Sequence, residues 1–298
     1  MKNELGGNIL HERRLIKRAI DEIYNGEAKK INFVWIEANG CTGNIISFLN
    51  ADQPDVAYFL EEMVDLKFSP SLMQAEGEVA YEKFLEVLNT DFILGVEGAI
   101  TNIDEGFYNI FATYKGRRIP TAEAINLAAG KAKAIIAIGT CASFGGISAA
   151  RPNPTGCKSL GEFLGREVIN IPGCPANPLW VMGTIASIIL YKKVEIDEKG
   201  RPIMFFKETN HTNCPRRSYF DNKVYAGKLG EKECMIKVGC KGPITKAYCP
   251  LGLWNSRINW PVEANTPCIG CASEFFPDGT EPFVRFDEVL KKPEVDNN

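Results

Sequence analysis

The chain has 298 residues, 45% of them hydrophobic and 24% charged, a balance typical of globular proteins that form one large domain or two ordinary ones. Its formal net charge of −3 gives no support to binding of nucleic acid or of an anionic membrane, which both require a basic surface. The longest apolar stretch, residues 180–191, is too short to span a bilayer.

Residues 1–30 form a polar, charged extension, in which we expect one amphipathic helix over about residues 10–24. The extension contains no apolar stretch of the kind that a signal peptide requires. None follows Arg13 and Arg14 either, as it would in a twin-arginine export signal. We therefore expect a solvated N-terminal helix and a cytoplasmic protein.

Short apolar runs alternate with helical stretches from residue 31 to about residue 195. The expected strands are residues 31–36, 92–96, 134–139 and 168–172, and the expected helices are residues 76–88, 122–132 and 178–191. Apolar runs of this length are typical of parallel strands that helices cover on both faces. The alternation predicts an α/β domain with a doubly wound parallel sheet over residues 31–195.

The alternation stops after about residue 195. Residues 205–285 are rich in Cys, Pro, Gly and Asn and contain few long periodic runs. Such a segment buries little apolar area for its length, and inorganic clusters are one means of holding it together. We therefore expect a second, small and irregular domain over residues 196–298 that carries metal clusters.

Cysteine is the most informative residue type in this chain. Nine of the ten cysteines lie in short segments rich in Gly and Pro, and six of them fall between Cys214 and Cys271. In a chain without signs of secretion, thiols at this density are more typical of iron–sulfur or zinc ligands than of disulfides.

Three cysteines, Cys41, Cys141 and Cys174, each directly follow an expected strand. The carboxyl ends of parallel strands meet at one edge of an open sheet, so we expect these three thiols to lie close together. Neighbouring glycines allow the backbone to approach a bulky inorganic core. Three unrelated core cysteines are the alternative, which their equivalent positions after the strands disfavour.

The sequence leaves the identity of a fourth ligand in this first set undecided. A C-x-x-C pair would place it at Asn44, whose amide is a poor ligand for iron beside thiolates. Either the site holds a three-iron cluster on three thiolates, or Asn44 or a water completes a fourth corner. Cys157 is a further candidate, although an unligated loop thiol is the favoured interpretation of that residue.

Two further sets lie in the irregular domain. His211, Cys214, Cys234 and Cys240 supply four ligands, which suit a [4Fe–4S] cluster, with zinc as the chemical alternative. The third set has only three thiols, those of Cys249, Cys268 and Cys271, the last two forming a C-x-x-C pair. Three thiolates suit a [3Fe–4S] cluster better than zinc, which would require a fourth ligand.

Eight segments of the chain match, in order, the motifs of a known family. They are WIEANGCTGN (35–44), VEGAI (96–100), GTCASFGG (139–146), RPNPTG (151–156), PGCPANP (172–178), HTNCPR (211–216), GCKGPIT (239–245) and WPVEANTPCIGC (260–271). The chain thereby resembles the small, electron-transfer subunit of [NiFe] hydrogenases over residues 31–285.

The resemblance implies a flavodoxin-like N-terminal domain and a wire of three clusters. The first set would hold the proximal cluster, facing the nickel–iron site of a separate large subunit. His211 and its three cysteines would hold the distal [4Fe–4S] cluster. The third set would hold the medial [3Fe–4S] cluster, with Pro261 where three-iron versions carry proline. Hydrogen would be split at the nickel–iron site, and electrons would leave along the wire.

The departures from the family pattern are informative. Most members carry Cys at the position of Asn44, whereas this sequence is similar to the cytosolic uptake-type and sensory-type branch. We therefore favour [3Fe–4S] over [4Fe–4S] for the proximal cluster. The resemblance also implies a heterodimer with the large subunit. We further expect a higher oligomer of such heterodimers, with a redox protein or a quinone-linked partner as acceptor.

Two carboxylates follow strands at the same expected sheet edge. Glu97 lies in a family motif at the subunit interface, so we expect it to be a candidate proton relay, with a structural capping role as the alternative for both Glu97 and Glu37. A hydrogen sensor built on the same machinery is the alternative function. A zinc-stabilised scaffold and a flavoprotein are disfavoured by the three-thiolate sets and by Cys41 in the loop where phosphate would bind.

Overall fold

A five-stranded parallel sheet forms the centre of the protein, in the order β2-β1-β3-β6-β7. The computed structural model describes residues 2–285, and side chains from residue 12 onward. The strands are β1 (Ile31–Glu37), β2 (Val64–Phe68), β3 (Phe92–Glu97), β6 (Ala134–Ile138) and β7 (Ile169–Ile171). The first strand in the sequence is β1. Strand β2 pairs with one side of β1, and β3, β6 and β7 follow in this order on its other side. This confirms the predicted doubly wound α/β fold.

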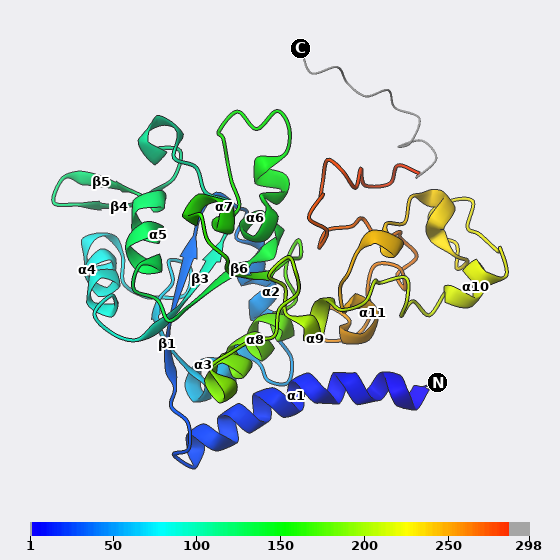
Figure 1. Ribbon diagram of the computed structural model, residues 1–298, viewed down its shortest axis with the longest axis horizontal. Coiled ribbons are helices and arrows are strands. Elements are labelled where there is room, and N and C mark those ends of the chain that lie inside the picture. The colour runs from blue at the N-terminus through cyan, green and yellow to red at the C-terminus, as the bar shows by residue number, and fades with distance from the viewer. Residues whose placement is uncertain (1, 286–298) are drawn as a thin grey trace.

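Helices cover both faces of the sheet (Figure 1). Successive side chains of a strand point to opposite faces, so in β1 Phe33 and Trp35 join one core while Val34 and Ile36 join the other. The first core includes residues of α2 (Gly43–Leu49), α3 (Val56–Glu62) and α8 (Pro178–Tyr191). The second includes residues of α4 (Gly77–Val87), α5 (Thr121–Ala129), α6 (Gly139–Phe144) and α7 (Leu160–Leu164).

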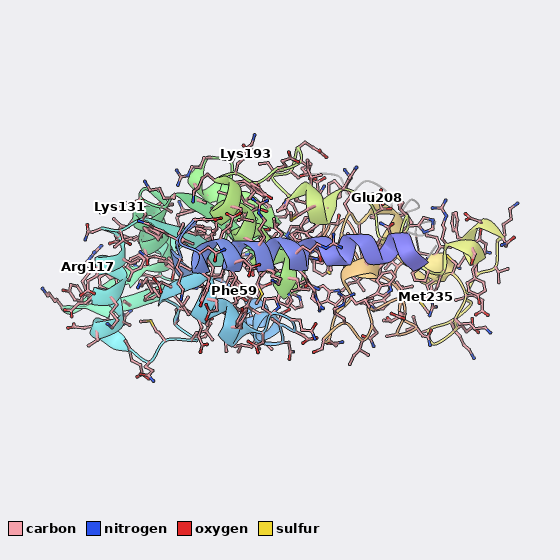
Figure 2. All side chains as sticks on the ribbon, turned by 90° about the horizontal axis from the view of Figure 1, so that it is seen from below. Phe59, Arg117, Lys131, Lys193, Glu208 and Met235 are labelled. Carbon is pink, nitrogen blue, oxygen red and sulfur yellow. The ribbon has the colours of Figure 1, made fainter. Side chains whose placement is uncertain are left out.

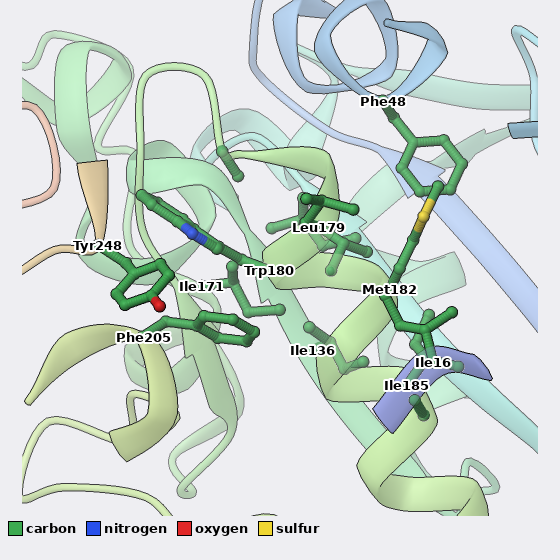
Figure 3. Packing of buried hydrophobic residues seen from close by; sticks show 14 of the residues in the cluster. Ile16, Phe48, Ile136, Ile171, Leu179, Trp180, Met182, Ile185, Phe205 and Tyr248 are labelled. Atoms are coloured by element: carbon green, nitrogen blue, oxygen red, sulfur yellow. The ribbon is translucent and has the colours of Figure 1, made fainter. Parts of the chain in front are cut away.

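The N-terminal helix α1 (Lys2–Tyr24) is longer than expected and is part of the core. Its residues Leu15, Ile16, Ala19 and Ile20 are buried in the first core, and Figure 3 shows Ile16 beside Ile185 of α8. Seen from below, α1 runs along much of the length of the molecule (Figure 2). The expectation of a solvated helix was therefore wrong, because one face of α1 supplies apolar side chains to the core.

Several elements have no counterpart among the predicted ones. Between β3 and α5 the chain forms an antiparallel hairpin, β4 (Ile110–Tyr114) and β5 (Arg117–Pro120). Strand β2 at the sheet edge is half-exposed and alternates apolar with charged residues, and so lacks the continuous apolar run used to find the other strands. Short 3-10 helices lie at Ile103–Gly106 and Gly146–Ala149.

Beyond α8 the chain is irregular, as the composition predicted. Its regular pieces are α9 (Ile203–Phe206), α10 (Arg217–Asp221), α11 (Cys249–Gly252) and the 3-10 turns Met235–Val238 and Gly242–Ile244. This part packs against α8 through aromatic contacts. The centroid of the Trp180 ring lies 5.2 Å from that of Phe206 and 6.3 Å from that of Phe205, which Figure 3 shows beside it. In the described part of the chain, no helix combines the length and apolarity needed to cross a bilayer.

Candidate metal centres

The carboxyl end of the sheet brings the first three cysteines together. Cys41 follows β1, Cys141 lies in α6 directly after β6, and Cys174 lies between β7 and α8. Cys174 is exposed on one side, but the protein around the rest of its thiol partly desolvates it and raises its pKa to about 11, and the nearby thiols of Cys141 and Cys41 raise it as well. Mutual influence of this kind places the three thiols in one neighbourhood, as the strand-end positions predicted.

Asn44 lies at the same edge of the sheet, and both polar atoms of its side-chain amide form hydrogen bonds. Its Nδ2 donates to Glu97 Oε1 at 3.0 Å, and its Oδ1 accepts from the backbone N–H of Ala176 at 2.8 Å. Its own backbone N–H donates to Glu97 Oε1 at 2.8 Å. The amide fits into space left by Gly139, whose backbone φ of +83° and lack of a side chain keep that space open. Ligation of iron by Asn44 would require this arrangement to change, and a ligand role for Asn44 stays a prediction.

Cys157 is engaged in a loop. Its thiol is 5% exposed and lies 3.3 Å from both Asn39 Nδ2 and Thr155 Oγ1. Its backbone N–H donates to Asn153 Oδ1 at 2.9 Å. These contacts suit the favoured interpretation, an unligated loop thiol.

Glu97 ends β3 as a carboxylate that is 1% exposed. Burial raises its pKa, the donors from Asn44 lower it, and the nearby Glu37 raises it. Trp35 Nε1 donates to its second oxygen at 3.3 Å. Glu37 Oε1 is buried with no hydrogen-bond partner. The two carboxylates thus lie near each other at the cysteine-bearing edge of the sheet, where Glu97 has the contacts of a firmly positioned group.

The four residues of the second set line one narrow cavity, together with Trp260 and Val262: His211, Cys214, Cys234 and Cys240. Burial raises the pKa of Cys240 to about 12 and also raises that of Cys214. Burial and the nearby Arg217 lower the pKa of His211, which favours the neutral imidazole that can bind a metal.

The third set is the most deeply enclosed. Burial raises the pKa of Cys249, Cys268 and Cys271, the last to about 12. Asn210 Nδ2 lies 3.6 Å from the Cys268 sulfur, and the Thr140 hydroxyl donates to the Cys271 carbonyl. Asn210 and Thr140 were missed from the sequence, although each directly precedes a predicted ligand.

The third set lies between the other two. The thiol of Cys271 and that of Cys174 of the first set are close enough for Cys174 to raise the pKa of Cys271. At the other side, Cys268 raises the pKa of Cys240 and Cys214 of the second set. Cys174 also lines one cavity together with Cys249, Cys268 and Cys271, so the thiols form a continuous series from the sheet edge, through the third set, to the second set.

The donor atoms fit iron–sulfur clusters. Buried thiols that raise one another's pKa hold their protons until a cationic core compensates the thiolate charge, so metal binding and deprotonation occur together. Thiolates, with one imidazole, are the ligands that such clusters use. In the part of the chain that the structure describes, no three His, Cys, Asp or Glu side chains come together closely enough to hold a single metal ion.

Comparison with known proteins identifies the family. The family described as the C-terminal part of the NiFe/NiFeSe hydrogenase small subunit matches residues 206–284, and "NADH ubiquinone oxidoreductase, 20 Kd subunit" matches residues 41–188. The chain is 40% identical over 276 residues to the periplasmic [NiFeSe] hydrogenase small subunit of Desulfomicrobium baculatum, covering 86% of this chain and 87% of the relative. This chain belongs to the hydrogenase small subunits.

Other relatives agree with this assignment. The small subunit 1 of the periplasmic [NiFe] hydrogenase of Nitratidesulfovibrio vulgaris is 39% identical over 267 residues, covering 86% of this chain and 82% of the relative. A solved [NiFeSe] hydrogenase chain of Dm. baculatum superimposes with a TM-score of 0.83 at 39% identity, covering 87% of this small subunit and 99% of that chain. A solved chain of the actinobacterial-type NiFe-hydrogenase from Ralstonia eutropha H16 superimposes with a TM-score of 0.81 at 28% identity. The match covers 91% of this small subunit and 87% of that chain.

The narrower assignment within the family gains no support. The two curated relatives named above are both periplasmic enzymes by their descriptions. They favour neither the cytosolic uptake-type nor the sensory-type branch that Asn44 and its neighbourhood suggested from the sequence. The hydrogenase small subunit is therefore the level at which the chain is identified.

Proposed function

We propose that this small subunit relays electrons from hydrogen oxidation, at a nickel–iron site in a large subunit, through three iron–sulfur clusters to an acceptor. The continuous series of thiol sets carries this proposal, because electron transfer requires closely spaced sites from a buried centre to the surface. The clusters, when bound, supply one-electron redox chemistry. The protein supplies the thiolates and the imidazole, and it buries Cys249 and Cys268 in the middle of the series.

The first set is proposed to face the large subunit. Cys41 and Cys174 are exposed on this chain, in contrast to the third set, of which Cys249 and Cys268 are buried. Exposed apolar side chains of α2 lie nearby, with Ile46 60% and Leu49 51% exposed. A protein surface that covered them would also shield the proximal cluster from water. We infer a heterodimer on this face, and a higher oligomer of heterodimers stays a prediction.

We assign the ligands as the sequence predicted them. His211 and its three cysteines would hold a distal [4Fe–4S] cluster, and the third set would hold a medial [3Fe–4S] cluster. For the proximal cluster we favour [3Fe–4S]. The support is that only three thiols converge there, while hydrogen bonds to Glu97 and Ala176 occupy the amide of Asn44.

Metal analysis of the heterodimer tests this assignment. Two three-iron clusters and one four-iron cluster predict about ten irons on this chain, with two distinct [3Fe–4S] EPR signals after oxidation. A total of about eleven irons with one such signal would show a complete proximal cluster. Zinc without acid-labile sulfide would contradict the electron-relay function altogether.

We propose enzymatic turnover rather than hydrogen sensing, because the relatives named above are described as hydrogenases. Steady-state hydrogen oxidation by the heterodimer tests this, since a sensor would turn over slowly. The cytoplasmic location also stays a proposal. The two relatives described as periplasmic favour the other compartment. Cell fractionation followed by detection of this subunit decides between the two.

A further inference from the structure

The segment that surrounds the second thiol set is basic, although the whole chain is acidic. Residues 216–237 contain six basic residues and three acidic ones, a local net charge of +3, whereas the chain carries −3. The basic residues are Arg216, Arg217, Lys223, Lys228, Lys232 and Lys237, and the acidic ones are Asp221, Glu231 and Glu233. Charge of this sign is therefore concentrated at one end of the protein.

The acidic residues of this segment are mostly engaged within it, whereas the lysines are exposed. Asp221 pairs with Arg217, with 2.8 Å between Oδ1 and Nε. The carboxylate of Glu231 accepts the backbone N–H of Gly227 at 2.7 Å, and this contact lowers its pKa. Lys223, Lys228, Lys232 and Lys237 are exposed, and within the described residues none of the four forms an ion pair.

The basic segment is attached to the second thiol set. The backbone N–H of Arg217 donates to the Cys214 carbonyl at 2.9 Å, and that of Ala226 donates to the Cys234 carbonyl at 2.9 Å. The ring of Phe220 in α10 packs edge-on against His211, with centroids 4.5 Å apart. The positive charge of the exposed lysines in this segment thus lies near the outer end of the thiol series.

Cations also lie over the aromatic rings of this surface. The Arg217 guanidinium is 5.7 Å from the Phe220 ring centroid, and Lys237 Nζ is 4.7 Å from that of Tyr225. Figure 1 shows α10 at the end of the molecule that is remote from the five-stranded sheet. This surface is therefore remote from the face proposed for the large subunit.

We propose that this basic surface, defined as Arg217, Lys223, Lys228, Lys232 and Lys237, docks an acidic one-electron carrier protein. The inference rests on the proposed relay function and specifies the class of its acceptor. Complementary charge accelerates encounter and orients the partner, and it needs no large apolar contact. With a cluster bound by His211 and its three cysteines, each encounter would transfer one electron to an oxidised carrier. Two carriers accept the two electrons of one hydrogen molecule, whose two protons leave from the large subunit.

The dependence on salt tests the sign of the docking surface. The assembled heterodimer is supplied with hydrogen and reduces either an acidic [2Fe–2S] ferredoxin or a basic cytochrome c. Between low and high ionic strength we expect kcat/KM for the ferredoxin to fall about tenfold or more, because screening removes the attraction. The value for cytochrome c is expected to stay level or rise. A ferredoxin rate independent of salt, or attraction of the cytochrome instead, would overturn the proposal.

Charge reversal locates the surface. The double variant Lys223→Glu and Lys237→Glu is expected to lower kcat/KM for the ferredoxin about tenfold and to flatten its salt dependence. The matched control, Lys83→Glu with Lys131→Glu, makes the same charge change on exposed lysines of the sheet domain and should leave the rate unaltered. Figure 2 shows Lys131 at the end of the molecule opposite Met235. Equal losses in both double variants would contradict docking at the basic surface.

A neutral dye separates this proposal from the relay function. Hydrogen-dependent dye reduction by the unaltered heterodimer is expected, and its absence would contradict the relay function rather than the docking surface. In the charge-reversed variant, dye reduction should be unchanged while ferredoxin reduction falls. If dye reduction also falls, the substitutions have damaged electron transfer within the subunit. The test of the docking surface is then the salt dependence of ferredoxin reduction by the unaltered heterodimer.

Discussion

Asn44 connects two segments of the sheet edge that the chain brings together from distant positions. Its amide bridges Glu97 at the end of β3 and the Ala176 N–H in the loop after Cys174. The sequence drew attention to Asn44 only as the place of a missing thiol. The pairing with Glu97 could not be predicted, because it depends on which strands are neighbours and on the space above Gly139.

The variant Asn44→Cys tests the two candidate roles of this residue. A fourth thiol should raise the iron content by about one per heterodimer and remove one of the two [3Fe–4S] EPR signals. It should also lower stability by about 1–3 kcal/mol, because the Ala176 N–H and the Glu97 carboxylate each lose a partner. Asn44→Ala is the control, since it removes the same side-chain hydrogen bonds without adding a thiol or a carboxylate. An unchanged iron content in Asn44→Cys would show that position 44 does not face the cluster.

Glu12 on α1 is a second buried carboxyl with an unusual environment. It is 2% exposed, and its Oε1 has no hydrogen-bond partner. Burial raises its pKa from 4.5 to about 8, against the lowering influence of Arg257, Arg13 and the adjacent hydroxyl of Tyr248. The folded protein therefore keeps this proton up to about pH 8, whereas the unfolded chain loses it above 4.5.

Stability should consequently fall as the pH rises between those two values, by up to about 1.4 kcal/mol per pH unit from this group. Glu12→Gln retains the neutral form at every pH, so its unfolding temperature should decline less than that of the natural chain between pH 5 and pH 8. Thermal unfolding of the heterodimer across this range measures the difference. Glu27→Gln, at an exposed position after α1, should follow the natural chain. Parallel curves for Glu12→Gln and the natural chain would contradict the raised pKa.

At the scale of elements, the predictions succeeded where the apolar pattern is strong. The strands that became β1, β3, β6 and β7 were predicted, as was α8 over 178–191. The short helices α2, α3 and α6 were missed, because elements of six or seven residues carry less than two turns of periodic signal. The burial of α1 was missed because its apolar residues are separated by charged ones.

The burial of one face of α1 leads to a prediction about the stability of the protein. Ile16→Ala should lower the free energy of unfolding by about 2–5 kcal/mol, since it removes a side chain that is 1% exposed and leaves a cavity against α8. Arg14→Ala changes an exposed position on the same helix and should have little effect. Thermal unfolding of both variants compares the two. Equal, small effects would show that α1 does not contribute to the core in solution.

At the scale of the whole molecule, the thiol series crosses from one fold type to another. Its first members come from ends of a regular sheet, which sequence patterns locate well. The others lie in irregular backbone, where the spacing of cysteines predicted the sets but not their spatial order. The family resemblance implied that the third set is the medial one, and the structure agrees, since Cys271 lies near Cys174 and Cys268 lies near Cys214.

The chain should be inactive by itself. The family resemblance places the nickel ligands in the large subunit, so the isolated chain, purified anaerobically with its clusters, should be brown and inert toward hydrogen. Dye reduction under hydrogen, before and after addition of the large subunit, measures this. Activity of the isolated chain would contradict its assignment as the relay half of the enzyme.

The enclosure of the third thiol set has a consequence for biogenesis. Cys249 and Cys268 are 6% and 7% exposed, whereas Cys41 and Cys174 lie open on the surface. A scaffold protein that delivers preformed clusters can reach the open thiols until the large subunit arrives. Cys249 and Cys268 present little of their surface to such a scaffold once the C-terminal segment has folded around them. We therefore expect maturation to proceed from the interior outward, with the innermost cluster inserted during folding of the chain and the one at the sheet edge inserted last.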